Sequence, residues 1–178
     1  MKYGIDFGHG CPSDGGAVGL RHEESMIYET GILVIDKLID LGHSVTRCRP
    51  SKTYSLRDSL QKRCWIANNA RVDRFVSIHF NAFDGSAHGT EVLYVSSSGK
   101  KIATPVVNEI AKLGFVNRGA KFRRDLYVLN NTKAPAILIE GCFVDSRRDI
   151  ALFDAEKMAS AIVKGLTGKL PSNDCTCG

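Results

Sequence analysis

The chain has 178 residues, of which 43% are hydrophobic and 24% charged, and its formal net charge is +5. This length suits one domain with a single core, and the composition is that of an ordinary globular protein. The basic residues form only short, scattered clusters, so we expect no nucleic-acid partner. No apolar run is long enough to cross a membrane, and the chain enters a strand pattern at once, without the leader of a signal peptide. We therefore expect a protein that is not embedded in a membrane and that acts where it is made or leaves by an unencoded route.

Strands alternate with helices along the sequence, judged by apolar periodicity and turn residues. The expected strands cover residues 2–7, 43–48, 73–82, 89–96, 126–130 and 134–143, and the expected helices cover residues 23–41, 55–70, 101–115 and 154–166. We place strand 126–130 at an edge of the sheet and the apolar strand 134–143 at its centre. Pro105 falls in the first turns of its predicted helix, where proline is tolerated.

This alternation predicts a single-domain, three-layer α/β sandwich, with a mostly parallel twisted sheet and helices on both faces. We expect the domain to span residues 1–168 and a tail or linker to span residues 169–178. Cys175 and Cys177 lie in that tail, which would hold a metal poorly, so we interpret them as incidental. The chain's other four cysteines predict neither a zinc knuckle nor a disulfide framework.

Four polar residues stand where a strand ends or a helix begins, and ligands collect at that edge of an open α/β sheet. They are His9, Glu23, His79 and Glu140. Each of the first three also has a plain structural interpretation. His9 would be a polar residue of a glycine-rich turn, and His79 would be a hydrogen-bonded histidine of the core. Glu23 would be stabilised by the helix dipole at the start of its helix. Glu140 is the least ordinary, because an ionised carboxylate on the most apolar strand is costly unless a cation compensates it.

Together the four residues form a recognisable chemical set. Two imidazoles and one carboxylate, with a fourth position left to water, are typical of catalytic zinc. A second carboxylate near the metal suits a general base. The spacing follows no local motif such as H-E-x-x-H, so this prediction depends on the fold bringing distant strand ends together.

From "IDFGHG" to about "IVKGL", the chain resembles the zinc-dependent N-acetylmuramoyl-L-alanine amidases of the amidase-3 type, the catalytic domains of autolysins and phage endolysins. The matching motifs include "DFGHG" followed by "DGGAVG", then "DRFVSIHFNA", "HGTEVLY" and "NRGAKFRRDLYVLNNTKAPAILIEG". The sequence departs from the family at Phe7, where proline is frequent, and at Cys11, where a second glycine is frequent. Neither departure removes a ligand or the base.

The resemblance implies a hydrolase that cleaves the amide between N-acetylmuramic acid and L-alanine in peptidoglycan, with zinc as cofactor. It implies that His9, Glu23 and His79 bind the zinc, and that Glu140 takes the proton of water and delivers it to the leaving amine. Glu24 is an alternative ligand, because "HEES" offers two glutamates. We favour Glu23, which lies at the family's distance ahead of the glycine that closes the helix.

Two further residues, Asn81 and Arg118, are candidates for binding substrate. Asn81 would serve equally well to hold its strand end, and Arg118 has the alternative of an ordinary surface arginine. Cys11 and Cys142 lie close in sequence to predicted site residues, which raises the question of their oxidation.

Rival functions are a zinc peptidase of the peptidoglycan stem and a wall-binding module that no longer cleaves. A nucleotide-binding domain is disfavoured, because "GHGCPSDGG" lacks the lysine and spacing of a phosphate-binding loop. We expect the chain to act on the bacterial cell wall. The missing leader favours a lysin released by a separate membrane-permeabilising protein, with an autolysin and a spore-wall enzyme left open.

Overall fold

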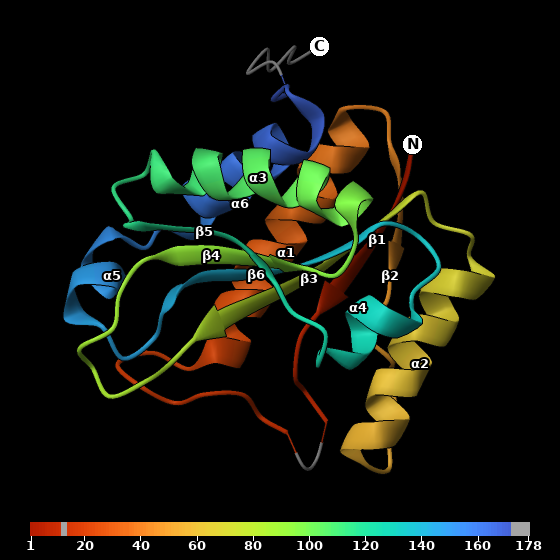
Figure 1. Cartoon of the computed structure of the whole chain (residues 1–178), viewed down its shortest axis with the longest axis horizontal. Helices are drawn as coiled ribbons and strands as arrows, with labels where there is room; N and C mark the ends of the chain where they lie inside the picture. Colours follow the sequence, from red (N-terminus) through yellow and green to blue (C-terminus); the bar gives the residue numbers. More distant parts are fainter. Residues whose placement is uncertain (12–13, 172–178) are drawn as a thin grey trace, which may run out of the picture.

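The protein, as a computed structural model, is described over residues 1–11 and 14–171 (Figure 1). Within these residues one sheet has the strand order β2-β1-β3-β6-β4-β5. Its strands are β1 (Lys2–Phe7), β2 (Ser44–Arg47), β3 (Arg74–Asn81), β4 (Thr90–Tyr94), β5 (Asn117–Phe122) and β6 (Ala136–Phe143). The helices are α1 (Glu23–Asp40), α2 (Leu56–Asn69), α3 (Ser97–Ala111), α4 (Tyr127–Asn131), α5 (Arg147–Leu152) and α6 (Ala155–Thr167).

The sheet is mostly parallel, as predicted. Strands β2, β1, β3 and β6 run in one direction. Strand β4 pairs with β6 in the antiparallel sense, and β5 follows β4 in parallel. The apolar segment expected at the centre of the sheet is β6, which lies between β3 and β4.

Helices cover both faces of the sheet, which confirms the three-layer sandwich (Figure 1). One apolar cluster joins the sheet to α1, α3 and α6, and a second joins the opposite face to α2 and α4. Strand β3 contributes to both, because successive side chains point to opposite faces of a strand. Val76 and Ile78 lie in the first cluster, whereas Phe75 lies in the second.

The prediction of an edge strand over residues 126–130 is wrong. Most of this segment is helix α4, which lies beside α2, and the two edge strands among the described residues are β2 and β5. The helix is stabilised locally, because the Asn130 side chain donates hydrogen bonds to the carbonyls of Arg124 and Leu126. Strand β5 escaped prediction because its sequence, "NRGAKF", is polar and glycine-containing, as edge strands often are.

Helix α3 begins at Ser97, four residues earlier than predicted, so Pro105 lies in the helix interior rather than in the first turns. The serine-rich "SSSG" has the composition of a loop, but Ser96 is the N-cap and its hydroxyl accepts a hydrogen bond from the Gly99 amide. Proline removes one helical hydrogen bond at an interior position. The packing of α3 against α6 and the sheet outweighs that loss.

Helix α6 ends at Thr167, and Gly168 caps it in the left-handed conformation. The division between a domain over 1–168 and a tail over 169–178 agrees with this end and stays a prediction. Cys175 and Cys177 lie outside the described residues. Among the residues described, no helix has the length and apolar character that a membrane span requires.

Candidate metal centre

The predicted ligands gather where the strand order changes direction. Strand β1 lies between β2 and β3, so the chain runs from β1 to β2 on one side and then crosses to β3 on the other side. His9 follows β1, and His79 lies near the carboxyl end of the neighbouring strand β3. Glu23 is the first residue of α1, and it reaches the same edge of the sheet. Such a switch point is the usual ligand site of open α/β sheets.

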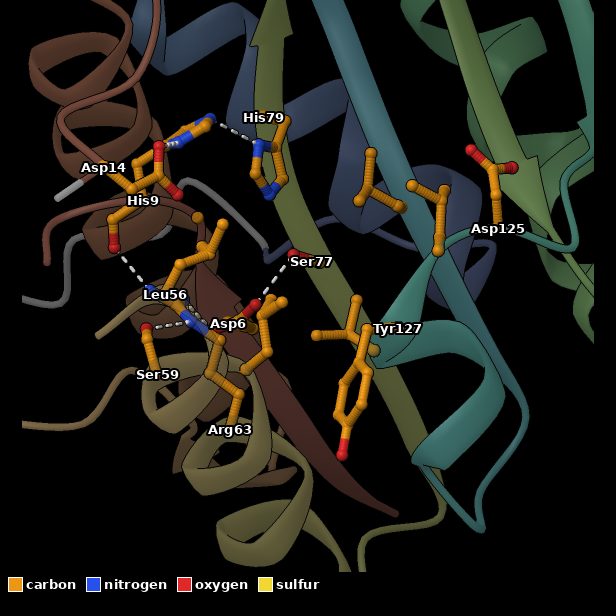
Figure 2. A pocket seen from close by; sticks show the side chains of 15 residues that line it. Asp6, His9, Asp14, Leu56, Ser59, Arg63, Ser77, His79, Asp125 and Tyr127 are labelled. Carbon is orange, nitrogen blue, oxygen red and sulfur yellow. Dashed lines mark hydrogen bonds and ion pairs between the residues drawn. The ribbon is translucent and has the colours of Figure 1, made fainter. Parts of the chain in front are cut away.

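Three side-chain atoms converge at this edge. His9 Nε2 lies 2.9 Å from Glu23 Oε1 and 3.0 Å from His79 Nδ1. His79 Nδ1 lies 3.2 Å from the same Glu23 oxygen. Figure 2 shows the two imidazoles facing one another. The three groups together offer ligand atoms within 4.8 Å of one another, and two histidines with one carboxylate are a donor set that zinc favours.

Glu23 is held firmly in this arrangement. Its side chain is 3% exposed, and its two oxygens accept backbone hydrogen bonds from Ala17 (2.7 Å) and Phe80 (3.1 Å). The alternative ligand, Glu24, is half-buried and pairs with Arg49 at 2.5 Å. The structure therefore brings Glu23, and not Glu24, to the two histidines.

Asp14, which the sequence analysis missed, holds the His9 ring from its other side. Its Oδ1 lies 2.5 Å from His9 Nδ1. Histidines that bind metals usually donate their second ring N–H to a carboxylate or carbonyl, which fixes the tautomer and the ring orientation. The contact leaves His9 Nε2 directed at Glu23 and His79. The composition of the loop "SDGG" predicts a turn, and it does not indicate that Asp14 would contact His9.

The glycines around His9 make room for the cluster. A Cβ at Gly8 would lie 2.3 Å from the His79 ring, so no larger residue fits without moving that histidine. A Cβ at Gly16 would lie 3.0 Å from Glu23 Oε2 and 3.1 Å from the His9 ring. His9 itself has a positive φ of 52°, a strained conformation for a residue other than glycine.

The charges of the cluster shift the pKa values of its members. Burial of the His9 ring acts to lower its pKa, but the Glu23 and Asp14 carboxylates outweigh burial and raise the pKa to about 9. Burial of Glu23 acts to raise its pKa, but hydrogen bonds from His79 and His9 outweigh burial and hold that pKa far below its ordinary range. In the absence of a metal, the charges of His9 and Glu23 thus stabilise one another.

Glu140 lies on β6 directly opposite His79 on β3 and opposite Glu91 on β4. Its Oε2 is buried and has no hydrogen-bond partner among the described residues. Burial, reinforced by the negative charges of Glu23 and Glu91, raises the pKa of Glu140 to about 8. A carboxyl group with such a pKa, next to a metal site, can both accept and donate a proton near neutral pH.

Of the two candidate substrate residues, Asn81 lies on β3, next to the β6 strand of Glu140, and Arg118 lies on β5, one strand farther away. Arg118 is paired with Glu91, another residue that the sequence analysis missed. The Arg118 guanidinium donates to Glu91 at 2.8 Å and lies over the Phe143 ring. Lys121 donates to the same Glu91 oxygen at 2.6 Å. Asn81 ends β3 and its side-chain oxygen accepts a hydrogen bond from the Ala82 amide. Arg118 therefore has partners within the protein, and substrate binding by either residue stays a prediction.

A pocket of about 240 Å³ opens beside the cluster on the α2 and α4 face of the sheet (Figure 2). His9, His79 and Asp14 form one wall. The remaining lining is mainly apolar and includes Leu56, Leu60, Leu126, Tyr127, Val128 and Leu138. This pocket would receive apolar groups of a molecule whose reacting atom lies at the histidines.

The two cysteines near the predicted site differ in their surroundings. Cys142 is buried in the apolar cluster under α1, α3 and α6, and burial raises the pKa of its thiol. Such a thiol reacts slowly with oxidants. Cys11 is also buried, in the loop that contains Asp14, with which it forms an isolated β-bridge.

Comparison with known proteins places the chain in a defined group. The model of a family described as N-acetylmuramoyl-L-alanine amidase matches residues 4–169. The chain is 35% identical to an uncharacterised cell wall amidase of Bacillus anthracis over 91% of its own length, and 30% identical to the endolysin of Bacillus phage SPP1 over 90%. It spans 34% of the first relative and 61% of the second.

The fold is that of a solved catalytic domain. The catalytic domain of CD27L, an endolysin targeting Clostridia Difficile, superposes with a TM-score of 0.88 at 29% sequence identity. The match covers 95% of this chain and 98% of that domain. The likeness extends over the sheet and both helical layers.

Proposed function

The chain belongs to the N-acetylmuramoyl-L-alanine amidase family, and on that premise we propose that it hydrolyses the amide between N-acetylmuramic acid and L-alanine in peptidoglycan. The convergence of His9, Glu23 and His79, near a Glu140 carboxyl group with one buried oxygen that has no hydrogen-bond partner, carries this proposal. The substrate would make the bacterial cell wall the place of action. The names of the relatives, a cell wall amidase and an endolysin, support the same activity.

The donor set fits zinc. His9 would bind it through Nε2, His79 through Nδ1 and Glu23 through Oε1, since these are the atoms that meet. Bound there, zinc supplies Lewis acidity that activates water and polarises the scissile carbonyl. Asp14 keeps the His9 ring in the tautomer that leaves Nε2 available.

Glu140 is the proposed catalytic base and acid. Its carboxylate would take the proton of the attacking water and then deliver it to the alanine nitrogen, because an amine leaves poorly unless it is protonated. The raised pKa of about 8 suits the second step, in which the group must be an acid. Its position on β6, opposite His79, places it at the same edge of the sheet as the three ligands.

The apolar pocket next to His9 and His79 is the proposed site for the part of the substrate that flanks the scissile amide. Both sides of that amide carry methyl groups, one on the lactyl ether and one on alanine. Leu60 and Leu138 offer the apolar contact that such groups favour. We include Asn81 and Arg118 as candidates for polar contacts to the substrate, and residues 169–178 as a tail outside the catalytic domain.

Digestion of purified peptidoglycan tests the proposal. We expect new L-alanine amino termini, intact glycan strands, loss of cleavage with a chelator, and recovery when zinc is restored. Amino termini within the stem peptide would identify a zinc peptidase instead. Binding to the wall without any cleavage would identify a wall-binding module.

A further inference from the structure

Arg63, on α2, connects the interior of the sheet to the metal centre without touching any side chain of the proposed ligands. Its guanidinium donates hydrogen bonds to the Asp6 carboxylate and to the carbonyls of Phe7 and His9. Its Nε donates to the Ser59 hydroxyl at 3.2 Å. Arg63 is therefore bound to the last two residues of β1 and to His9, two residues beyond the end of the strand.

The β-ladder does not extend to His9. Strand β1 pairs with β3 as far as Phe7, and the last backbone hydrogen bond on that side runs from Gly8 to the Ile78 carbonyl, at 3.1 Å. His9 then takes a positive φ, which is unfavourable for a residue with a Cβ. Such a conformation persists only where the surrounding structure holds it in place, and Arg63 supplies a bond to the His9 carbonyl.

The positive charge of Arg63 is balanced by the carboxylate of Asp6. The guanidinium and the Asp6 carboxylate lie 2.5 Å apart, and both residues are at least 97% buried. The second Asp6 oxygen accepts a hydrogen bond from the Ser77 hydroxyl at 2.7 Å. Although Arg63 lines the pocket, each of its three nitrogens already has an acceptor, so the guanidinium is committed to the protein rather than to a substrate anion.

We infer that Arg63 is a positioning residue for the metal centre: by holding the His9 carbonyl, its guanidinium keeps the His9 ring aimed at Glu23 and His79. This inference rests on the proposed function in one respect, because it assumes that His9, Glu23 and His79 bind zinc. Lysine would not replace arginine here, because one ammonium group cannot direct donors to Asp6, Phe7, His9 and Ser59 at once.

The test is the zinc affinity of folded variants, measured by competition with a chromophoric chelator. We expect Arg63→Lys to weaken zinc binding about 10–100-fold, the usual loss when an outer partner of a metal ligand is removed. The visible spectrum of the cobalt-substituted protein should change as well, because it reports the ligand geometry. Arg74→Lys is the matched control. Arg74 lies at the end of β3 away from the metal centre, and it also donates to a backbone carbonyl, that of Leu166.

A merely structural role for Arg63 predicts a different outcome. Arg63→Lys would then lower the melting temperature of the metal-free protein, yet bind zinc within about twofold of the parent chain and give an unchanged cobalt spectrum. That result would overturn the inference. Parent protein that binds no zinc would instead contradict the proposed function.

Should Arg63→Lys fail to fold, Ser59→Ala decides the matter. This change removes one hydroxyl that holds the guanidinium and leaves the Arg63–Asp6 pair in place. A loss of about threefold in zinc affinity supports the inference, as expected for a partial loosening of an outer contact. An unchanged affinity contradicts it.

Discussion

Glu23 is buried and Glu140 is half-buried at the same edge of the sheet, and the protein surrounds the two carboxyl groups in opposite ways. Glu23 receives two backbone N–H groups and two imidazoles, which stabilise its charge. Glu140 has one buried oxygen without a partner and two other carboxylates whose charges oppose its ionisation. The surroundings of Glu23 suit a metal ligand, which must stay charged and fixed. The surroundings of Glu140 suit a group that must exchange a proton.

The largest expected effect comes from removing the exchangeable proton. Glu140→Gln should lower kcat/KM for peptidoglycan cleavage by about 10²–10⁴-fold, the usual contribution of a general acid–base group. Zinc content should stay unchanged, because the three proposed ligands are intact. Glu24→Gln is the control, since Glu24 pairs with Arg49 and lies outside the cluster. If Glu140→Gln kept more than about a tenth of the activity, Glu140 would not be the proton carrier.

The next largest effect concerns the charged Glu23 cluster, in which the protonation of His9 competes with zinc binding. In the metal-free protein the pKa of His9 is raised from its ordinary value of 6.5 to about 9, so zinc must displace a proton at neutral pH. The apparent zinc affinity should therefore rise about tenfold for each pH unit between about 7 and 9. Calorimetry in buffers of different ionisation enthalpy would count the protons released.

Asp14→Asn provides the matching control for this pH dependence. The change removes one of the two carboxylates that raise the pKa of His9, so the affinity should depend less steeply on pH near 8. Without zinc, the raised pKa of His9 stabilises the fold fully below pH 6.5, and this stabilisation is lost as pH rises through about 9. Equal zinc affinities of the parent chain at pH 6 and pH 8 would contradict the assignment of His9 as a ligand that loses a proton when zinc binds.

The smallest expected effect concerns Glu91, the charged neighbour of Glu140. Burial opposes its ionisation, but Arg118 and Lys121 lower its pKa below the ordinary 4.5. The pair therefore stabilises the fold above pH 4.5, and this is lost as pH falls through the lowered pKa. Glu91→Gln should cost about 1 kcal/mol or less at pH 7, because both cations are partly exposed.

Thermal unfolding at a series of pH values from 7 downward would measure this contribution, and the difference in stability between parent and variant should shrink as pH falls below 4.5. The variant should also lower the pKa of Glu140, since one of the opposing charges is gone. A shift of the activity profile toward higher pH would contradict that coupling.

The sequence predicted the sheet, its mostly parallel order and the convergence of four site residues, because each of them ends a strand or begins a helix. Asp14 and Arg63 were missed for a physical reason. Their roles come from contacts with His9 across a loop and across 54 positions of chain, and no local pattern encodes such contacts. The short helix α4 was missed because its aromatic Tyr127 and β-branched Val128 favour a strand, whereas packing decides the structure of so short a segment.

The position of β6 in the sheet has a consequence for synthesis of the protein. Strands β3 and β4 are made earlier, yet each pairs with β6 and not with the other. A ribosome must therefore have released residues 136–143 before the sheet can close and before Glu140 can face His79. Nascent chains that end before β6 would carry all three proposed ligands without the proposed proton carrier, so the proposed site would be complete only after β6 has been made.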